Sequence, residues 1–302
     1  MSQRSTSVSI ITINYNQLEV TCEMLDSIRR LELQPQEIIV IDNASSKSPK
    51  QYLEANYPEV TFIQSDTNLG FSGGNNLGIA KAKGEYLYLV NNDTELLEES
   101  ITPLLQLFEE NAKLGIVSPL ICYHPDQHDN KSDLIQYAGT TEVNPYTARN
   151  STIGSQLLDE GQFTKAVPTA YAHGAAMMIP RKVVDEVGNM PEQFFLYYEE
   201  LDWCEQIRRA GYEIFVEPRA RIYHKESVSV GQMSTLKTFY LNRNRIFFMR
   251  RNKNGIKFIF FSLFLIFFTI PKNAAFYLVK GQFDHLQAFL SAIWWNILQK
   301  KV

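Results

Sequence analysis

The sequence predicts an α/β fold in which a mostly parallel central sheet is flanked by helices. Short apolar, β-rich runs alternate with segments in which apolar residues recur at helical spacing. The runs cover residues 8–13, 38–41, 60–63 and 86–90, and the clearest helical segments cover residues 20–31 and 98–111. Such alternation builds βαβ units, which place helices on both faces of a parallel sheet.

The composition predicts one large folded domain with an appendage. At 302 residues, with 45% hydrophobic and 21% charged residues, the chain can bury a core of its own. Its three cysteines are odd in number and widely spaced, which indicates a reducing compartment and neither a disulfide framework nor a zinc cluster. The first 14 residues contain no apolar signal-peptide core, so we expect the chain not to be exported.

The charge is distributed unevenly along the chain. Residues 235–302 contain eleven basic side chains and one acidic side chain, a net charge of +10, whereas the whole chain carries −4. Residues 1–234 therefore carry −14. An acidic body joined to a basic, aromatic tail indicates an anionic surface as a neighbour. The apolar stretches within the tail favour a membrane over nucleic acid, and we expect no nucleic-acid partner.

The tail predicts helices that attach to a membrane surface. Residues 258–270 are almost entirely apolar, but this run is only 13 residues long before Pro271, and a spanning helix needs about 20. Trp294 and Trp295 are of the residue type enriched at the lipid headgroups. This pattern favours an interfacial attachment. The alternative is a helical hairpin that packs on the body or on another subunit, which would make the protein a homo-oligomer.

The middle of the chain predicts a long surface excursion between two ordered regions. Residues 123–168 are rich in Asp, Asn, Gly, Pro and Ser, and a loop of this length is typical of a lid or an acceptor-binding segment. Order resumes at residues 172–179, with a helix from Arg181 and a second helix that ends at Ala210 before Gly211.

Polar residues follow the apolar runs, at the edge where ligands bind in parallel sheets. Asp42 ends the second run and is suited to a ribose or base, although, taken alone, an Asx turn is the better explanation. Asn91, Asn92 and Asp93 follow the fourth run. A carboxylate there suits Mg²⁺ or Mn²⁺ bridged to phosphates; the alternative is a capped turn before a helix that starts at Thr94.

A glycine-rich segment covers residues 68–78. We expect Gly70, Gly73 and Gly74 to precede a helix, so that the backbone approaches a ligand and the helix N-terminus faces a diphosphate. The spacing matches neither the dinucleotide fingerprint nor the P-loop, and by itself it is equally typical of a tight turn.

The densest acidic cluster is Glu199, Glu200 and Asp202, directly after an aromatic stretch. Apolar rings and neighbouring like charges favour the protonated form of a carboxylate, which suits a general base. Acidic residues at a helix N-terminus are the alternative explanation. His224 follows a strand-like run, where a lone histidine is more often structural than a ligand.

Together these segments resemble the inverting glycosyltransferases of family 2, which have the GT-A (Rossmann-like) fold. The resemblance covers roughly residues 7–250 and is especially close to the bacterial rhamnosyl- and galactofuranosyl-transferase-like branch. It rests on four segments in the family's order, VSIITINYN, VIDNASS, NLGFSGGNNLG and FFLYYEELDWCEQIRRAGY. Each segment is weak alone, and the four in order are specific.

The resemblance implies a domain organisation. Residues 1–234 would form the catalytic domain, with a nucleotide-binding half at about 1–122, a variable loop at about 123–168 and an acceptor half at about 169–234. Residues 235–302 would form the basic, apolar helical segment that associates with a membrane.

The resemblance also implies site residues. The donor, a dTDP- or UDP-sugar, would be held by Thr12, Asn14, Asp42, Gly73, Gly74 and Asn75. Asn91, Asn92 and Asp93 match the aspartate-rich metal motif, with Asn in its first two positions, so Asp93 would be the main carboxylate ligand of Mn²⁺ or Mg²⁺. His224 falls where related enzymes place a second ligand, and imidazole alongside oxygen is compatible with Mn²⁺.

The catalytic base and the acceptor side follow from the same resemblance. Glu200 matches the base, which in most relatives is the Asp of a Glu-Asp pair, and Glu199 and Asp202 are the reserve candidates. Residues His173, Gly174 and Ala175 match a segment that lines the acceptor side.

The sequence therefore predicts a metal-dependent, inverting transfer of a sugar to a glycan or lipid-linked acceptor, in cell-surface polysaccharide synthesis at the cytoplasmic face of the membrane. Two alternatives differ from this prediction. A sugar-nucleotide pyrophosphorylase would carry a Gly-rich basic loop where this chain has Asn14-Tyr15-Asn16-Gln17. A catalytically silent sugar-nucleotide-binding partner of a polysaccharide assembly is compatible with the substitutions at Asn91, Asn92 and Glu200.

Overall fold

A computed structural model describes residues 7–125, 134–225, 234–253 and 255–299. Contacts divide the chain into two compact units. The first unit comprises Met1–Thr141, Thr152–Phe195 and Glu199–Ser229. The second unit comprises Glu142–Ser151, Leu196–Tyr198 and Val230–Val302. Each unit is described by itself.

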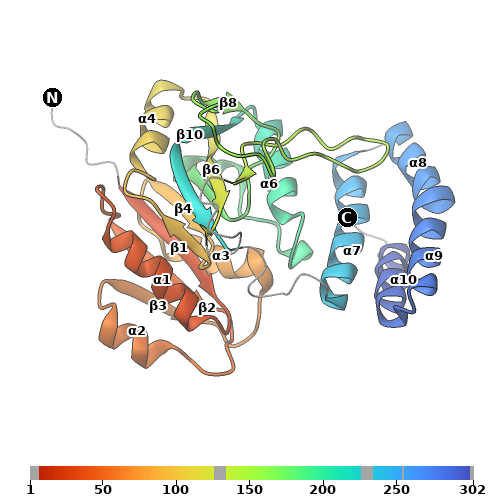
Figure 1. Cartoon of the computed structure of the whole chain (residues 1–302), viewed down its shortest axis with the longest axis horizontal. Coiled ribbons are helices and arrows are strands. Elements are labelled where there is room, and N and C mark those ends of the chain that lie inside the picture. Colours follow the sequence, from red (N-terminus) through yellow and green to blue (C-terminus); the bar gives the residue numbers. More distant parts are fainter. Residues whose placement is uncertain (1–6, 126–133, 226–233, 254, 300–302) are drawn as a thin grey trace. The chain divides into compact units, whose positions relative to one another are not determined.

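The first unit is built on a central sheet with the strand order β3-β2-β1-β4-β9-β6-β10-β5 (Figure 1). The strands that begin it are parallel, as the sequence predicts: β1 (Val8–Asn14), β2 (Glu37–Asp42), β3 (Val60–Gln64) and β4 (Tyr86–Val90). Beyond β4 the sheet is mixed. It continues through β5 (Thr94–Leu96), β6 (Leu114–Tyr123), β9 (Ala176–Pro180) and β10 (Glu213–His224). Strand β10 is parallel to β6, whereas β9 and β5 are antiparallel to their neighbours.

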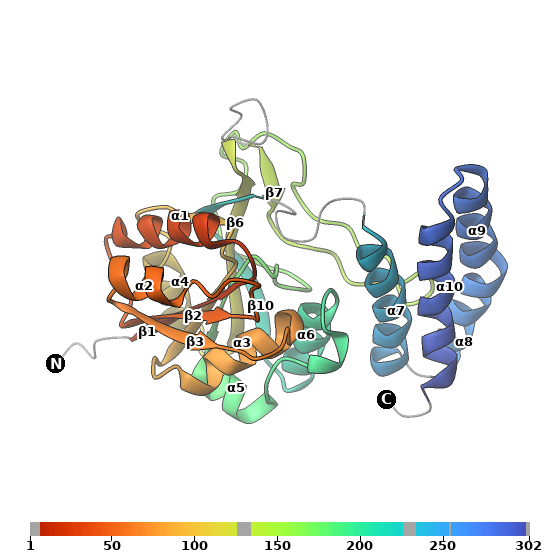
Figure 2. The ribbon, with the colours of Figure 1, turned by 90° about the horizontal axis from the view of Figure 1, so that it is seen from below.

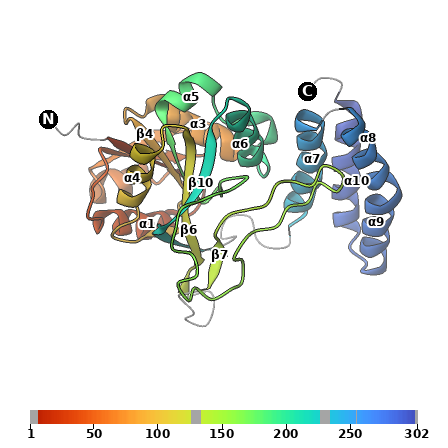
Figure 3. The ribbon, with the colours of Figure 1, turned by 90° about the horizontal axis from the view of Figure 1, so that it is seen from above.

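Helices cover both faces of this sheet (Figures 2 and 3). One face carries α1 (Leu18–Arg29), α2 (Lys50–Asn56) and α4 (Thr102–Glu110), and the other carries α3 (Gly70–Lys81), α5 (Arg181–Val187) and α6 (Glu199–Arg209). The core under the first face is formed by alternate strand residues such as Ile10 and Val40 against Met24 and Leu25. The central sheet flanked by helices is therefore confirmed.

The glycine-rich segment lies inside a helix rather than before one. Helix α3 begins at Gly70, so Gly73, Gly74 and Gly78 are helical residues. A Cβ atom at Gly74 would lie 2.7 Å from Ile13 Cδ1, and one at Gly78 would lie 2.4 Å from Ile11 Cγ2. Glycines four residues apart share one helix face, and here that face packs directly on β1. Close helix–sheet packing thus explains Gly74 and Gly78.

The residues after Asp93 form a strand and not the helix expected from Thr94. Strand β5 pairs with the end of β10 in antiparallel register, with His224 opposite Thr94. The backbone N–H of Lys225 also donates to the Asp93 carbonyl at 2.8 Å. The excursion at 123–168 has little regular structure in its described part, which contains β7 (Ile135–Tyr137) and β8 (Val167–Pro168).

The second unit is mainly helical. It contains α7 (Thr235–Asn252), α8 (Gly255–Phe264), a π-helical segment (Leu265–Thr269), α9 (Ile270–Val279) and α10 (Phe283–Leu298). Helices α7 and α10 lie side by side. The Nδ2 group of Asn296 in α10 donates to the Arg243 carbonyl of α7 at 2.9 Å.

The helix that contains the apolar run does not stop at Pro271. Residues Gly255–Val279 form one 25-residue helix that is long and apolar enough to cross a membrane by length and composition. Proline lacks the N–H that an α-helix would use, and the π-helical turn that precedes Pro271 changes the hydrogen-bond spacing there. The helix is therefore longer than the 13-residue apolar run on which the sequence-based expectation of an interfacial attachment depended.

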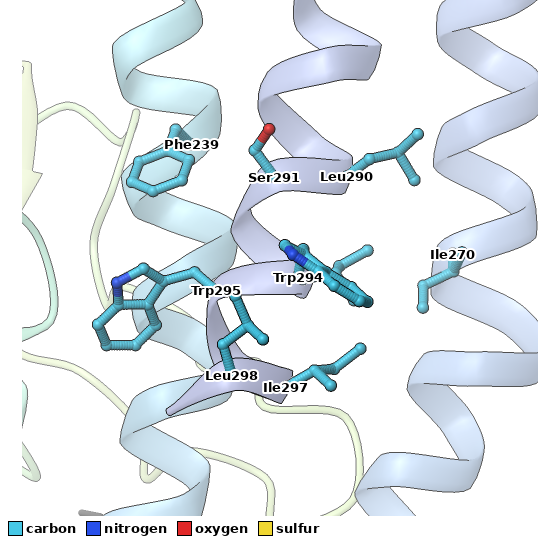
Figure 4. Close-up of a pocket in the computed structure, with 9 residues that line it drawn as sticks. Phe239, Ile270, Leu290, Ser291, Trp294, Trp295, Ile297 and Leu298 are labelled. Atoms are coloured by element: carbon cyan, nitrogen blue, oxygen red, sulfur yellow. The ribbon is translucent and has the colours of Figure 1, made fainter. Parts of the chain in front are cut away.

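The surface of the second unit is strongly apolar. Ile256, Phe267 and Phe268 in the long helix are each more than 60% exposed within the unit. Figure 4 shows a groove between α7, α9 and α10 that is lined by Phe239, Ile270 and Trp294 among others. Exposed apolar area of this extent marks a surface that contacts a membrane or another protein.

The packing of α3 predicts an unusual response to a small substitution. Replacing a helical glycine by alanine normally stabilises a helix by about 0.5–1 kcal/mol. In Gly78→Ala the new methyl group would overlap Ile11 and Ile41, so we expect a net loss of about 1–3 kcal/mol in the free energy of unfolding. Urea denaturation measures it. The control is Ala80→Gly at an exposed position of the same helix, which should cost only the helix propensity. A stabilised Gly78→Ala variant would contradict this packing.

Candidate active site

The site lies at the edge of the sheet where β1, β2 and β4 end. Because these strands are parallel, their carboxyl ends meet at the same edge. Asn14 lies in register with Asp42 across the β1–β2 pair, and Asn91, Asn92 and Asp93 directly follow β4. The sheet therefore brings together the polar residues that the sequence singled out after each run.

Asp42 is fully buried and its carboxylate is saturated by the protein. It accepts hydrogen bonds from Asn14 Nδ2, Ser45 Oγ and Gln64 Nε2, each at 2.6 Å, and from the backbone N–H of Ser45 at 3.1 Å. The bond from the Ser45 N–H closes an Asx turn. Asp42 thus fixes Asn14 and the loop that follows β2, which is the alternative that the sequence left open.

A chain of hydrogen bonds continues from Asp42 across the sheet edge. Asn14 Oδ1 accepts from Thr21 Oγ1 at 3.0 Å, and Thr21 Oγ1 accepts from Asn92 Nδ2 at 2.9 Å. Thr12 is also fully buried, and its Oγ1 finds no hydrogen-bond partner among the described residues. Buried amide and hydroxyl groups held in such a chain have fixed orientations, so Asn14 and Asn92 are pre-positioned.

Asp93 and His224 face each other across the β5–β10 pair. The Nε2 atom of His224 lies 3.1 Å from Asp93 Oδ1, and both side chains are nearly buried. The Nδ1 atom of His224 lies 2.8 Å from Oε1 of Gln136. An amide oxygen can only accept, so Nδ1 carries the hydrogen and the lone pair of a neutral imidazole is on Nε2.

This geometry fits a divalent cation. A lone pair on Nε2 and a carboxylate oxygen repel each other at 3.1 Å unless a proton or a cation lies between them. Two ligands at ~2.1 Å from one ion and at a right angle to each other are ~3.0 Å apart. The Gln136 contact is also the arrangement in which a ligating histidine donates its second N–H to a carbonyl.

The Asp93–His224 pair supplies two ligands and no more. The described part of the chain contains no group of three or more His, Cys, Asp or Glu residues that could hold a metal ion. Magnesium-type ions are commonly bound by one or two carboxylates together with substrate phosphates. An ion held by this pair would therefore complete its coordination with oxygen atoms of a ligand.

The acceptor-side candidates lie beside this pair. The rings of His173 and His224 have centroids 6.0 Å apart, and the Ala175 carbonyl accepts from the Asn91 N–H at 2.9 Å. Burial, followed by the neighbouring His224, lowers the pKa of His173 to about 3. His173 is consequently neutral, and its Nδ1 accepts from the Ala175 N–H at 3.1 Å. A Cβ atom added at Gly174 would lie 3.7 Å from the Phe71 ring.

Two asparagines, Asn43 and Asn68, join the end of the second strand to the start of α3. Asn43 donates through Nδ2 to Asn68 Oδ1 and to the Gly70 carbonyl, and it accepts from the Leu69 N–H. Asn75 Nδ2 donates to the Phe71 carbonyl within the helix. Asn43 therefore orients the first turn of α3, whose N–H groups have no intrahelical partners. Its position within VIDNASS was the only signal for it, whereas nothing in the sequence indicates Thr21 or Gln136.

The acidic cluster opens helix α6. Glu199 and Asp202 are buried, and Asp202 Oδ2 accepts from Gln206 Nε2 at 2.8 Å. Glu200 is partly exposed. Because a proton acceptor must reach a substrate, Glu200 is the member of the cluster best suited to act as a base. Glu199 and Asp202 are enclosed by the protein.

The sequence profile of glycosyl transferase family 2 matches residues 9–188. This chain belongs to that family, and it is a glycosyltransferase. The matched region includes the strand ends, the glycine-rich helix and the segment 173–175, while Glu200 and His224 follow it.

Two curated relatives cover most of the chain. The low-salt glycan biosynthesis hexosyltransferase Agl10 of Haloferax volcanii is 28% identical over 79% of this chain and 74% of its own length. The N-acetylglucosaminyl-diphospho-decaprenol L-rhamnosyltransferase of Mycobacterium tuberculosis is 22% identical over 74% of this chain and 77% of its own.

Solved structures of GT-A glycosyltransferases share the fold. GalNAc-T7 with UDP, GalNAc and Mn²⁺ matches with a TM-score of 0.59 and 17% identity, over 78% of this chain and 48% of that one. The mannosyltransferase PcManGT of Pyrobaculum calidifontis, in complex with GDP-Man and Mn²⁺, matches with a TM-score of 0.58 and 14% identity, over 98% and 76% of the two chains. The fold is therefore of the GT-A type.

Proposed function

We propose that this protein is an inverting, metal-dependent glycosyltransferase that moves a sugar from a dTDP- or UDP-sugar to a hydroxyl group of a glycan or lipid-linked acceptor. The observation that carries the proposal is the Asp93–His224 pair, with 3.1 Å between Nε2 and Oδ1 at the sheet edge. In the GT-A structures that match, the named ligands of those proteins are a nucleotide or nucleotide sugar and Mn²⁺.

Asp93 and His224 would hold Mn²⁺ or Mg²⁺ through one carboxylate oxygen and one imidazole nitrogen. When bound, the ion neutralises the charge that develops on the leaving diphosphate. Asn14 and Asn92, fixed by Asp42 and Thr21, border the same edge and would bind the nucleotide. Gly73, Gly74 and Asn75 stay donor-pocket candidates through the first turn of α3, although the packing on Ile13 accounts for Gly74 independently.

Glu200 would act as the general base. Its carboxylate accepts the proton of the acceptor hydroxyl while that oxygen attacks the anomeric carbon. The bond from the anomeric carbon to the diphosphate oxygen breaks on the opposite face, so the configuration inverts and no covalent intermediate forms. His173, which is neutral and adjacent to the Asp93–His224 pair, would border the acceptor.

The second unit would associate with the cytoplasmic face of a membrane. The 25-residue helix Gly255–Val279 would insert its exposed apolar side chains into the lipid, and the basic residues of the +10 tail would contact anionic headgroups. Such an attachment suits a lipid-linked acceptor and a role in cell-surface polysaccharide synthesis. The name of the mycobacterial relative includes a diphospho-decaprenol acceptor, which supports the same class for this chain.

A second candidate function is a catalytically silent sugar-nucleotide-binding partner. It is favoured by the amides Asn91 and Asn92, which leave Asp93 as the single carboxylate of this motif. The two candidates differ in one measurable property, because a silent partner binds the donor without turning it over.

Donor binding should depend on metal and on Asp93. We expect one nucleotide among UDP, dTDP and GDP to raise the melting temperature with Mn²⁺ and much less without it. A ligand at about 100 times its dissociation constant stabilises by ~2.7 kcal/mol, which a thermal-shift assay detects. Asp93→Ala should abolish the shift, and Asp185→Ala at an exposed position of α5 should keep it. A well-folded sample that responds to no nucleotide would contradict the proposal.

Glu200→Gln should separate binding from chemistry. The amide cannot accept the proton of the hydroxyl, so we expect transfer to fall by about 10²–10⁴-fold. The metal-dependent thermal shift should stay unchanged, because binding of the nucleotide sugar does not require the Glu200 carboxylate. Glu109→Gln, at an exposed position of α4, is the matched control. Near-normal turnover by Glu200→Gln would remove Glu200 from the role of base.

A further inference from the structure

The segment directly before the acidic cluster has a strained backbone. Phe195, Tyr197 and Tyr198 have φ angles of 65°, 69° and 73°, although none of them is glycine. A positive φ is unfavourable for a residue other than glycine, and it persists only where surrounding contacts enforce it. Glu199 and Glu200 follow at once as the first residues of α6. The contacts that hold this segment therefore affect where α6 starts and where Glu200 lies.

Asn244 of α7 holds the middle of the segment. Its side chain is fully buried, and its Nδ2 group donates to the Leu196 carbonyl at 2.7 Å and to the Tyr197 carbonyl at 2.8 Å. Both hydrogens of one amide are thus used on two successive carbonyls. Phe248, one turn later on the same face of α7, packs against the Tyr198 ring with 5.6 Å between centroids.

Arg243 orients the Asn244 amide. Its Nε donates to Asn244 Oδ1 at 2.7 Å, which leaves Nδ2 turned toward the two carbonyls. The Arg243 guanidinium is itself enclosed between aromatic rings, 4.6 Å from the centroid of Tyr240 and 4.7 Å from that of Trp295. Cation–π contacts of a desolvated guanidinium are among the stronger ones. The hydrogen bond from Arg243 to Asn244 Oδ1 therefore fixes the direction in which the Nδ2 group of Asn244 points.

The other end of the segment is fixed within the first unit. The Phe195 carbonyl accepts from the Phe71 N–H at 2.7 Å. Gly70 has a φ of +70°, and a Cβ atom there would lie 2.1 Å from the Phe195 oxygen. The close approach needs glycine, because any side chain would displace this contact. Phe195, the first residue of the segment, is consequently held by Gly70 and Phe71 within the first unit.

We propose that Asn244 is a positioning residue for the catalytic base. Its two hydrogen bonds hold the Leu196 and Tyr197 carbonyls in the turn from which α6 starts, and thereby place Glu200 for proton transfer. The proposal rests on the proposed function, in which Glu200 is the base. Without the two donors, the amide no longer holds these carbonyls, and the turn with positive φ at Tyr197 and Tyr198 relaxes toward ordinary φ values, which shifts the start of α6.

The test is Asn244→Asp in the full-length chain. Aspartate has the same shape and can still accept from Arg243, but it has no N–H groups to donate to the carbonyls. Transfer is measured as release of UDP or dTDP from the nucleotide sugar that gives the metal-dependent thermal shift, with octyl glycosides as acceptors. We expect kcat to fall by about 100-fold, as for a displacement of ~1 Å, with the donor dissociation constant within about twofold of wild type.

The matched control is Asn242→Asp. Asn242 lies two residues earlier on α7, and its Nδ2 donates to the Thr238 carbonyl of the same helix at 2.8 Å. This variant also replaces a hydrogen-bonding side-chain amide by a carboxylate. It should nevertheless have the kcat and the donor affinity of the wild type. If Asn244→Asp does not fold, Asn244→Ser, which keeps a single donor, is measured by the same criteria.

A normal kcat per folded molecule in an Asn244 variant would overturn the proposal. So would an equal loss of donor affinity and kcat, which would indicate a general structural role. A wild-type protein that binds nucleotide and transfers no sugar would instead refute the proposed function itself. The two failures are therefore distinguished by which protein, variant or wild type, departs from expectation.

Discussion

The close approach of Asp93 and His224 is the constraint on which the rest of the site depends. Two nearly buried groups with lone pairs directed at each other need a proton or a cation between them, and Gln136 fixes which nitrogen of the imidazole faces the carboxylate. The antiparallel pairing of β5 with β10 creates this contact. The parallel ends of β1, β2 and β4 then bring Asn14, Asp42 and Asn92 to the same edge.

Much of the fold could be predicted from the sequence, because its signals are local. The alternation of apolar runs and helical segments placed the first strands within a residue or two of their observed bounds. Two predictions differ from the structure for the same reason. Glycine and proline were expected to end or precede a helix, but their surroundings allow both to lie inside one. Gly74 and Gly78 fit a helix against Ile13 and Ile11, and Pro271 is accommodated after a π-helical turn.

Less of the site could be predicted from the residues alone. The strand ends identified Asp42 and Asp93, whereas the role of His224 came only from the resemblance, since a lone histidine after a strand carries no signal. Gln136 lies 88 residues away in the short strand β7, and Thr21 is one hydroxyl on an amphipathic helix. Such contacts form between segments that are distant in the sequence, so the spacing of residues along the chain does not reveal them. Asn244 belongs to the same class.

The most direct test of the account is a crystal structure with the bound nucleotide and Mn²⁺, with the ion located by its anomalous scattering. The account predicts one manganese peak within about 2.5 Å of both Asp93 Oδ1 and His224 Nε2, with diphosphate oxygens completing the coordination. A nucleotide bound at the sheet edge with manganese held by other residues, or with no manganese at this pair, would contradict it.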